Sequence, residues 1–272
     1  MKTLVDLSGK RGLIVGIANE HSIAAGCARA FRDCGAGLGA TYLDEKARLF
    51  VEPVADALGV EWLAACDVRA PGQTEALFER VEREWGKLDF LLHSIAFAPK
   101  ADLQGRVVDT SSEGFATAMD VSCHSFLNMA RLAEPLMREG GCLLTVTFYG
   151  SERVVEHYNL MGPVKAALEA TVRYLAHELG PSNIRVNAIS AGPVLTRAAS
   201  GLTGFSGLLE ATARASPLRR NIEADEVGRT ALLFASDYTS GITGEVLRVD
   251  AGVHIESPVF STQISVNPED SR

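Results

Sequence analysis

The run RGLIVG at residues 11–16 is the stretch that decides the fold, because it is a short apolar segment that ends at a glycine. Residues 17–26, IANEHSIAAG, then lead through a polar turn into apolar positions that recur at helical spacing up to about Cys34. A second apolar run, LGATY, follows at residues 38–42. This order predicts strand, turn, helix and strand, with a helix N-terminus that would face a pyrophosphate. The spacing is not Gly-x-Gly-x-x-Gly, so a glycine that only serves a tight turn stays an alternative.

The remainder of the chain continues the same alternation. Strand-like runs occupy residues 60–66, 88–93, 142–148, 184–190 and 246–250, and helical patterns occupy residues 74–85, 115–137, 158–179 and 225–235. Such a series predicts an α/β protein with one Rossmann-type, doubly wound parallel sheet and helices on both faces. Ligands of such sheets bind at the carboxyl ends of the strands, where the sequence places Gly16, Asp67, Ser94, Phe148 and Gly192. We expect a single domain over residues 1–255 and a C-terminal extension over residues 256–272.

Composition excludes several classes of protein. The 272 residues are 47% hydrophobic and 22% charged, which suits one globular domain with a sizeable core. Residues 1–6 lack a signal-peptide core and no apolar run approaches the ~20 residues that cross a bilayer, so we expect a cytoplasmic protein with no membrane partner. Five isolated cysteines without ligand spacing predict no metal. The net charge of -8 argues against nucleic acid as a partner.

A tyrosine and a lysine lie seven residues apart in the segment YNLMGPVK at residues 158–165. Seven residues are nearly two helical turns, so Tyr158 and Lys165 would face one way. A phenol with a pKa of about 10 keeps its proton at neutral pH and can donate to an oxygen that becomes negative. The ammonium can hold a ribose. Pro163 is tolerated only in the first turn of a helix, so we predict that this helix begins near Tyr158.

Five motifs, taken together and in this order, resemble a known family. They are Gly16-x5-Ser22-Ile23-Ala24, Cys66-Asp67-Val68, His93-Ser94-Ile95-Ala96-Phe97-Ala98, Tyr158-x2-Met161-x3-Lys165 and Ala191-Gly192-Pro193-Val194-x-Thr196. The combination is similar to the enoyl-acyl-carrier-protein reductases, divergent members of the short-chain dehydrogenases/reductases, over about residues 7–252. Carbonyl-reducing members usually show Asn-Asn-Ala-Gly after the fourth strand and Tyr-x3-Lys on the helix, and this chain has neither.

The resemblance implies a role for individual residues. Tyr158 and Lys165 would be catalytic, and Lys165 would also hold the nicotinamide ribose together with Ile95. The remaining cofactor-binding residues would be Gly16, Ser22 and Ile23 at the pyrophosphate, Leu43, Asp67 and Val68 towards the adenine end, and Val194, Leu195, Thr196, Arg197 and Ala198 at the nicotinamide and second phosphate. The substrate-binding residues would be Ala98, Met161 and Phe205, the last on a flap near residues 195–215.

The end of the second strand indicates the choice of cofactor. Asp44 and Glu45 follow Leu43 there, and carboxylates repel a 2'-phosphate while they accept hydrogen bonds from ribose hydroxyls. NADH is therefore favoured over NADPH, although Lys46 and Arg48 follow closely and leave NADPH as the alternative.

The resemblance also implies a reaction and its partners. Hydride from NADH would add to the β-carbon of a trans-2-enoyl thioester on acyl carrier protein, in fatty acid biosynthesis, while Tyr158 donates to the carbonyl oxygen as an enolate forms. Protonation of the α-carbon would complete the saturated chain. The resemblance further implies a homotetramer.

Two departures from the family pattern leave other functions open. Phe148 stands where many bacterial relatives carry a second tyrosine, and we assign no catalysis to the neighbouring Tyr149. Residues 200–209 are glycine-rich and apolar where relatives often carry the basic residues that meet the carrier protein. The alternatives are a reductase of a coenzyme-A thioester or of another enone or carbonyl, and a noncatalytic NAD(H)-binding sensor or assembly protein.

Overall fold

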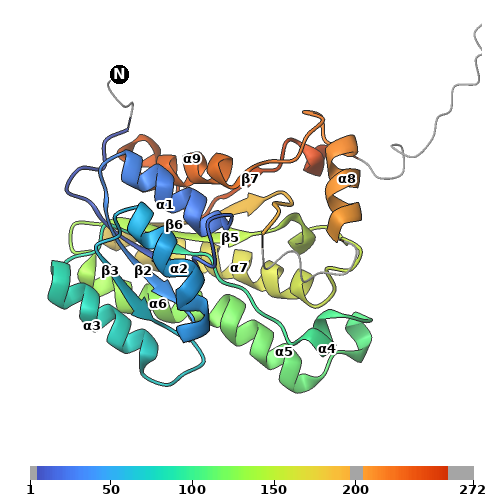
Figure 1. Ribbon diagram of the computed structural model, residues 1–272, viewed down its shortest axis with the longest axis horizontal. Helices are drawn as coiled ribbons and strands as arrows, with labels where there is room; N and C mark the ends of the chain where they lie inside the picture. The colour runs from blue at the N-terminus through green and yellow to red at the C-terminus, as the bar shows by residue number, and fades with distance from the viewer. Residues whose placement is uncertain (1–4, 197–204, 257–272) are drawn as a thin grey trace, which may run out of the picture.

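The computed structural model describes residues 5–196 and 205–256, and its centre is a parallel sheet of seven strands (Figure 1). The strands are β1 (Arg11–Val15), β2 (Gly37–Tyr42), β3 (Trp62–Ala65), β4 (Phe90–His93), β5 (Gly141–Thr147), β6 (Ile184–Ala191) and β7 (Val246–Val249). Their order across the sheet is β3-β2-β1-β4-β5-β6-β7. Strands β2 and β3 lie on one side of β1, and β4 to β7 lie on the other. The boundary between β1 and β4 is therefore the switch point where such folds bind ligands.

Helices cover both faces of the sheet, as the alternating pattern predicts. They are α1 (Ile23–Asp33), α2 (Glu45–Ala57), α3 (Gln73–Trp85), α4 (Lys100–Leu103), α5 (Ser112–Met119), α6 (Ser125–Ala133), α7 (Met161–Leu179), α8 (Phe205–Ala215) and α9 (Ala224–Ala235). Core residues of α1, α2 and α9 pack on one face, and those of α3, α6 and α7 pack on the other. In Figure 1, α4 and α5 extend beyond one end of the sheet. The doubly wound prediction is confirmed.

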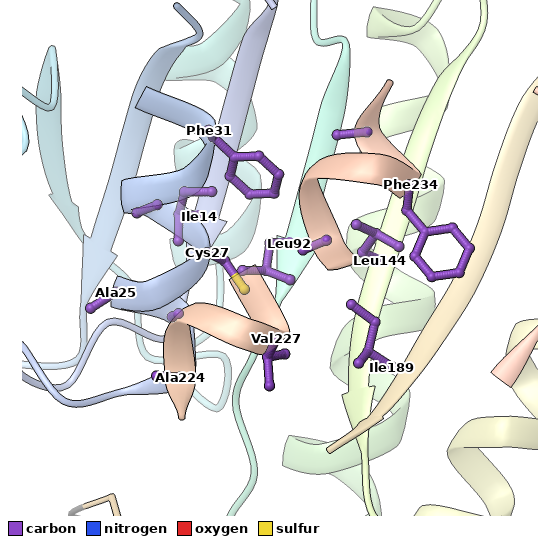
Figure 2. Close-up of a cluster of buried hydrophobic side chains, with 14 of the residues drawn as sticks. Ile14, Ala25, Cys27, Phe31, Leu92, Leu144, Ile189, Ala224, Val227 and Phe234 are labelled. Atoms are coloured by element: carbon purple, nitrogen blue, oxygen red, sulfur yellow. The ribbon is translucent and has the colours of Figure 1, made fainter. Parts of the chain in front are cut away.

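Successive strand residues supply the two cores in turn. Ile14, Leu92 and Leu144 point towards α1 and α9, where Figure 2 shows them with Phe31 and Phe234. Each of these three residues is preceded by a leucine that belongs to the opposite core: Leu13, Leu91 and Leu143. Because strand side chains alternate between faces, a strand buried on both sides reads as an uninterrupted apolar run.

Helix α2 is absent from the sequence-based prediction. Its apolar pattern is obscured because Leu49 and Phe50 are exposed while only Val51 and Ala55 are buried, and Pro53 lies inside the helix. Asp44, placed near a ribose by the sequence, forms the N-cap of α2: its carboxylate accepts a hydrogen bond from the Ala47 amide at 2.8 Å.

The helix predicted over residues 115–137 is several segments. Ser111 caps α5, a π-helix spans Asp120–His124, α6 follows, and a 3-10 turn covers Glu134–Leu136. The continuous prediction is wrong at the π-helix, where one extra residue per turn rotates the side chains without breaking the apolar pattern.

Helix α7 begins at Met161 and not near Tyr158. His157 and Asn159 have φ angles of 65° and 45°, and these left-handed conformations interrupt a right-handed helix on both sides of Tyr158. Pro163 is the third residue of α7, so its predicted place in the first turn is confirmed.

Helices α1 and α9 cross at two glycines. A Cβ atom on Gly228 would lie 2.3 Å from the Gly26 carbonyl oxygen, and one on Gly26 would lie 2.5 Å from the Ala224 backbone. The contact holds α1 against the sheet, and the Ser22 side chain caps α1 by accepting a hydrogen bond from the Ala25 amide at 3.3 Å. The helix N-terminus at the β1 turn is thus fixed by packing within the first turn of α1.

A methyl group at this crossing should separate the two helices. We expect Gly228→Ala to lower the free energy of unfolding by about 1–3 kcal/mol, the usual cost of overpacking a core. Gly207→Ala in α8 is the matched control, because a Cβ there meets no atom within 4 Å and alanine is the better helix former. Urea denaturation of both variants measures the difference; equal stability of the two would contradict the close crossing.

Candidate active site

A cavity of about 250 Å³ opens at the carboxyl edge of the sheet. The ends of β5 and β6, the loop after β4, the start of α7 and one residue of α8 form its wall. The lining residues are Ile23, Ala96, Phe97, Ala98, Leu103, Val146, Thr147, Phe148, Val155, Glu156, His157, Tyr158, Met161, Lys165, Ala191, Gly192, Pro193, Val194, Thr196 and Leu208. Most are apolar, so a phenol and an ammonium face a space with few polar groups.

The turn between β1 and α1 closes against the end of β4. Gly16 has a φ angle of 117°, and a Cβ there would lie 2.2 Å from the Ser94 carbonyl oxygen. Only glycine permits both the backbone angle and the contact. The turn therefore lies beside Ile95 and delivers Ile23, the first residue of α1, to the cavity wall.

The Tyr158 ring is held between two residues from the end of β5. Its centroid lies 4.7 Å from that of Phe148 in an edge-on arrangement, and a Cβ on Gly150 would lie 2.4 Å from the Tyr158 ring. Burial, with a contribution from Glu169, raises the pKa of Tyr158. The phenol therefore stays protonated across the physiological range and is a hydrogen-bond donor to the cavity.

Lys165 is buried in α7 and reaches back to the sheet. Its Nζ donates a hydrogen bond to the Val146 carbonyl oxygen at 2.8 Å, and the side chain lines the cavity. Burial lowers its pKa to about 8, against the opposing influence of Cys123 and Glu169. An ammonium so placed keeps two further N–H groups for a ligand, because it carries three donors.

Two buried polar residues brace the strand ends beneath the cavity. Glu169 accepts hydrogen bonds from Thr147 Oγ1 at 2.7 Å and from Ser151 Oγ at 2.5 Å, which ties α7 to the end of β5. His93 lies at the end of β4, with its Nδ1 2.9 Å from Thr145 Oγ1 and its Nε2 2.8 Å from Ser125 Oγ. Burial, with the nearby positive charge of Lys165, lowers the pKa of His93 to about 3, so its imidazole is neutral.

The structure brings about half of the predicted site residues to the cavity. These are Ile23, Ala98, Tyr158, Met161, Lys165, Val194 and Thr196. Gly16 and Ile95 adjoin it, and Ser22 lies behind Ile23 as the α1 cap. Leu43 and Leu195, with exposed fractions of 50% and 66%, do not line it. Arg197 and Ala198 lie outside the described residues, as does the side chain of Phe205, the first residue of α8.

Asp67 and Val68 follow β3, away from the cavity, at the predicted adenine end. Both carboxylate oxygens of Asp67 accept hydrogen bonds from Arg69, at 2.9 and 2.7 Å, and this contact lowers the pKa of Asp67. The Arg69 guanidinium also lies 5.4 Å from the Phe97 ring centroid. Arg69 thus connects the end of β3 to the loop that borders the cavity, a connection that no motif indicated.

Several cavity residues have no signal in the sequence. Leu103 ends the four-residue helix α4, and Val155 and His157 belong to an irregular segment before Tyr158. Ser122 lies in the π-helix, where its Oγ accepts a hydrogen bond from the Phe97 amide at 2.9 Å and supports the cavity loop from behind. Short irregular elements lack the periodicity that would have revealed them.

Comparison with known proteins shows which family the chain belongs to. The sequence model described as enoyl-(acyl carrier protein) reductase matches residues 16–254. The chain belongs to this family. It is 48% identical over 248 residues to enoyl-[acyl-carrier-protein] reductase [NADH] 1 of Rhizobium meliloti, an alignment that covers 91% of each chain. This is the reductase family that the motifs resemble.

Solved structures of family members have the same fold. The Anaplasma phagocytophilum reductase, in complex with NAD, superposes with a TM-score of 0.90 at 48% identity and covers 94% of this chain and 98% of its own. The Bacillus cereus reductase, in complex with NADP+ and an indole naphthyridinone, also has a TM-score of 0.90, at 44% identity over 93% of this chain and 100% of its own. Within the described residues, no helix has the length and apolar character needed to cross a bilayer.

The buried His93 should make stability sensitive to acid. Its pKa is near 6.5 in the unfolded chain and about 3 in the folded protein, so the unfolded state binds the additional proton between these values. Stability is therefore lost as pH falls below 6.5, by up to about 1.4 kcal/mol per pH unit.

The variant His93→Gln keeps a donor and an acceptor but has no such proton to bind. From pH 6.5 to pH 5.0, the free energy of unfolding in urea should fall by about 2 kcal/mol more for the wild type than for the variant. Groups common to both proteins cancel in this difference. Parallel pH dependence in the two would contradict a neutral His93.

Proposed function

We propose that this protein is an NADH-dependent reductase of the carbon-carbon double bond of trans-2-enoyl thioesters carried on acyl carrier protein, in fatty acid biosynthesis. The observation that carries the proposal is the pairing of a protonated phenol, Tyr158, with a buried ammonium, Lys165, in one mostly apolar cavity at the carboxyl edge of the sheet. A phenol there is placed to donate to an oxygen that gains negative charge. Membership of the reductase family supports the same reaction.

The residues present suit a dinucleotide. Gly16 lets the β1 turn approach the end of β4 closely, beside the N-terminus of α1, and a helix N-terminus in this place favours a pyrophosphate. Lys165 has donors directed at the cavity for ribose hydroxyls, and Ile95, Val194 and Thr196 border the same region. When bound, the cofactor supplies the hydride. Asp67 and Val68 would hold its adenine end, and Leu195, Arg197 and Ala198 would complete its border.

The chain's own groups stabilise the charge that the reaction creates. Tyr158 donates a hydrogen bond to the thioester carbonyl oxygen, and its raised pKa keeps that proton on the phenol. Lys165 adds positive potential, which is strong because few polar groups surround it. Phe148 contacts Tyr158 but has no hydroxyl, so Tyr158 acts without a second phenol at that position.

The surroundings of Asp44 support NADH over NADPH. Arg48, the cation that would meet a 2'-phosphate, is paired with Glu52 at 2.9 Å and with Glu45 at 3.5 Å. The Asp44 carboxylate is held as the cap of α2, near the end of β2. Both features disfavour a phosphate at this place.

The apolar wall suits an acyl chain. Ala98, Leu103 and Met161 belong to or pack against one small hydrophobic cluster that borders the cavity, and Phe205 on α8 would close it from the flap. The carrier is the open point, because residues 200–209 lack the basic side chains that an acidic carrier protein would meet. A coenzyme-A thioester is therefore the second candidate substrate.

We also propose a homotetramer and a cytoplasmic location. Phe115, Leu127 and Tyr174 on α5, α6 and α7 have exposed fractions of 45%, 42% and 73%, and neighbouring chains would cover them. All five cysteines are free, which suits a reducing compartment. The reductase unit would span residues 1–255.

The proposal is tested by NADH oxidation at 340 nm with one trans-2-enoyl chain offered on acyl carrier protein and on coenzyme A. We expect turnover with a higher kcat/KM for the carrier-protein thioester. A preference for coenzyme A would assign the second substrate class. Demonstrated NADH binding with no turnover on either thioester would contradict the reaction and favour a noncatalytic role.

Removal of one phenol oxygen should separate catalysis from binding. Tyr158→Phe is expected to lower kcat by about 10²- to 10³-fold, the usual loss for one donor to an oxyanion, with the dissociation constant of NADH nearly unchanged. Tyr149→Phe is the matched control, because Tyr149 does not line the cavity. Comparable losses in the two variants, or loss of NADH binding in Tyr158→Phe, would contradict the assigned role.

A further inference from the structure

Tyr158 is held in a turn whose two flanking residues have left-handed backbone conformations. His157 and Asn159 have positive φ angles, which only a few per cent of non-glycine residues adopt and in which histidine and asparagine are enriched. The turn carries hydrogen bonds from the Tyr158 amide to the Val155 carbonyl at 3.1 Å and from the Met161 amide to the Tyr158 carbonyl at 3.1 Å. Two such residues on either side of one position are uncommon, so a further contact that holds this turn is expected.

The side chain of Asn159 provides that contact. Its Nδ2 donates a hydrogen bond at 2.9 Å to the carbonyl oxygen of Leu103, which lies 56 residues earlier in the chain. Leu103 is the last residue of α4, where carbonyl groups lack partners within the helix. Asparagine suits the position twice, because it tolerates a positive φ and carries an amide donor.

The segment held in this way covers the cavity. Residues 97–103 include Phe97, Ala98 and Leu103, which line it. The same end of this segment is also attached to α5, because the Asp102 carboxylate accepts a hydrogen bond at 2.6 Å from the Ser111 amide, next to the N-terminus of α5. Ala98, Leu103 and Tyr158 also pack in one hydrophobic cluster with Met161. Residues 97–103, the acyl-site cover, are therefore joined to the Tyr158 turn by an apolar contact and by one hydrogen bond.

We propose that Asn159 is a positioning residue that couples the acyl-site cover to Tyr158. An acyl chain long enough to press on Leu103 fixes the cover, and the Asn159 amide passes that restraint to the turn that aims the phenol. Binding energy from the far end of the substrate is thus used to align the reacting end. This inference depends on the proposed enoyl-thioester reduction, and it adds a determinant of chain-length specificity.

Two substitutions isolate the hydrogen bond from the backbone angle. Asn159→Gly permits a positive φ and has no donor, while Asn159→Asp also tolerates this φ, keeps the shape and presents oxygen to the Leu103 carbonyl. With a twelve-carbon enoyl thioester we expect both variants to lose at least tenfold in kcat. With the four-carbon thioester, whose shorter chain makes less contact with the cover, the loss should be below threefold, and the KM for NADH should stay within twofold.

A double-mutant cycle with Leu103→Ala tests the coupling itself. If Asn159 acts through the cover, the two substitutions affect kcat for the long chain less than the product of their separate effects. Independent effects that multiply, or an equal loss for both chain lengths, would overturn the proposal, because a purely structural role lowers all rates alike.

Hydrogen exchange of residues 100–111 gives a readout that needs no turnover. In Asn159→Gly these amides should exchange faster than in the wild type, while those of α9 are unchanged. If the wild type reduces no enoyl thioester but the exchange rates still differ, the proposed function fails and the restraint on the cover stands. If the wild type is active and neither exchange nor chain-length dependence changes, the positioning role of Asn159 is wrong.

Discussion

The hydrogen bond from Lys165 Nζ to the Val146 carbonyl is the interaction on which the candidate site depends. Burial of an ammonium is unfavourable unless it is hydrogen-bonded, and the lowered pKa of Lys165 records that cost. Within the described part of the chain this is the one hydrogen bond of Nζ, which leaves two donors that a ligand in the cavity can use. The bond also fixes α7 against the end of β5, and Tyr158 precedes α7 by three residues.

The sequence was sufficient for the sheet because its physical signal is strong. A parallel strand buried on both faces must be apolar throughout, as in the residues around Ile14 and Leu144, and the crossover helices must lie between such runs. The prediction failed where a local feature competes with the periodicity. Pro53 and two exposed apolar residues concealed α2, and the π-helix at Asp120–His124 preserved the helical pattern while it changed the geometry.

The candidate site was predictable where a sequence motif marks a residue, and it was unpredictable where short loop segments meet. Tyr158, Lys165 and Ala98 were found because motifs mark them, and they do line one cavity. Leu103 and Arg69 belong to no sequence motif. Each contacts a residue that is distant in the sequence, Asn159 for Leu103 and Phe97 for Arg69. The assignments of individual residues to the cofactor and the acyl chain stay predictions, because geometry alone places side chains around a space and does not name its occupant.

The position of Tyr158 depends on two neighbours that lack groups, Gly150 without a side chain and Phe148 without a hydroxyl. Gly150 leaves room for the ring, and Phe148 contacts the ring edge without competing for its hydroxyl. The left-handed residues on both sides of Tyr158 hold its backbone outside α7, so the regular geometry of the helix does not set the direction of the phenol. A tyrosine inside α7 would have gained helical hydrogen bonds and lost this direction. Gly150 and the irregular start of α7 therefore set the position of the phenol in the cavity that Lys165 also lines.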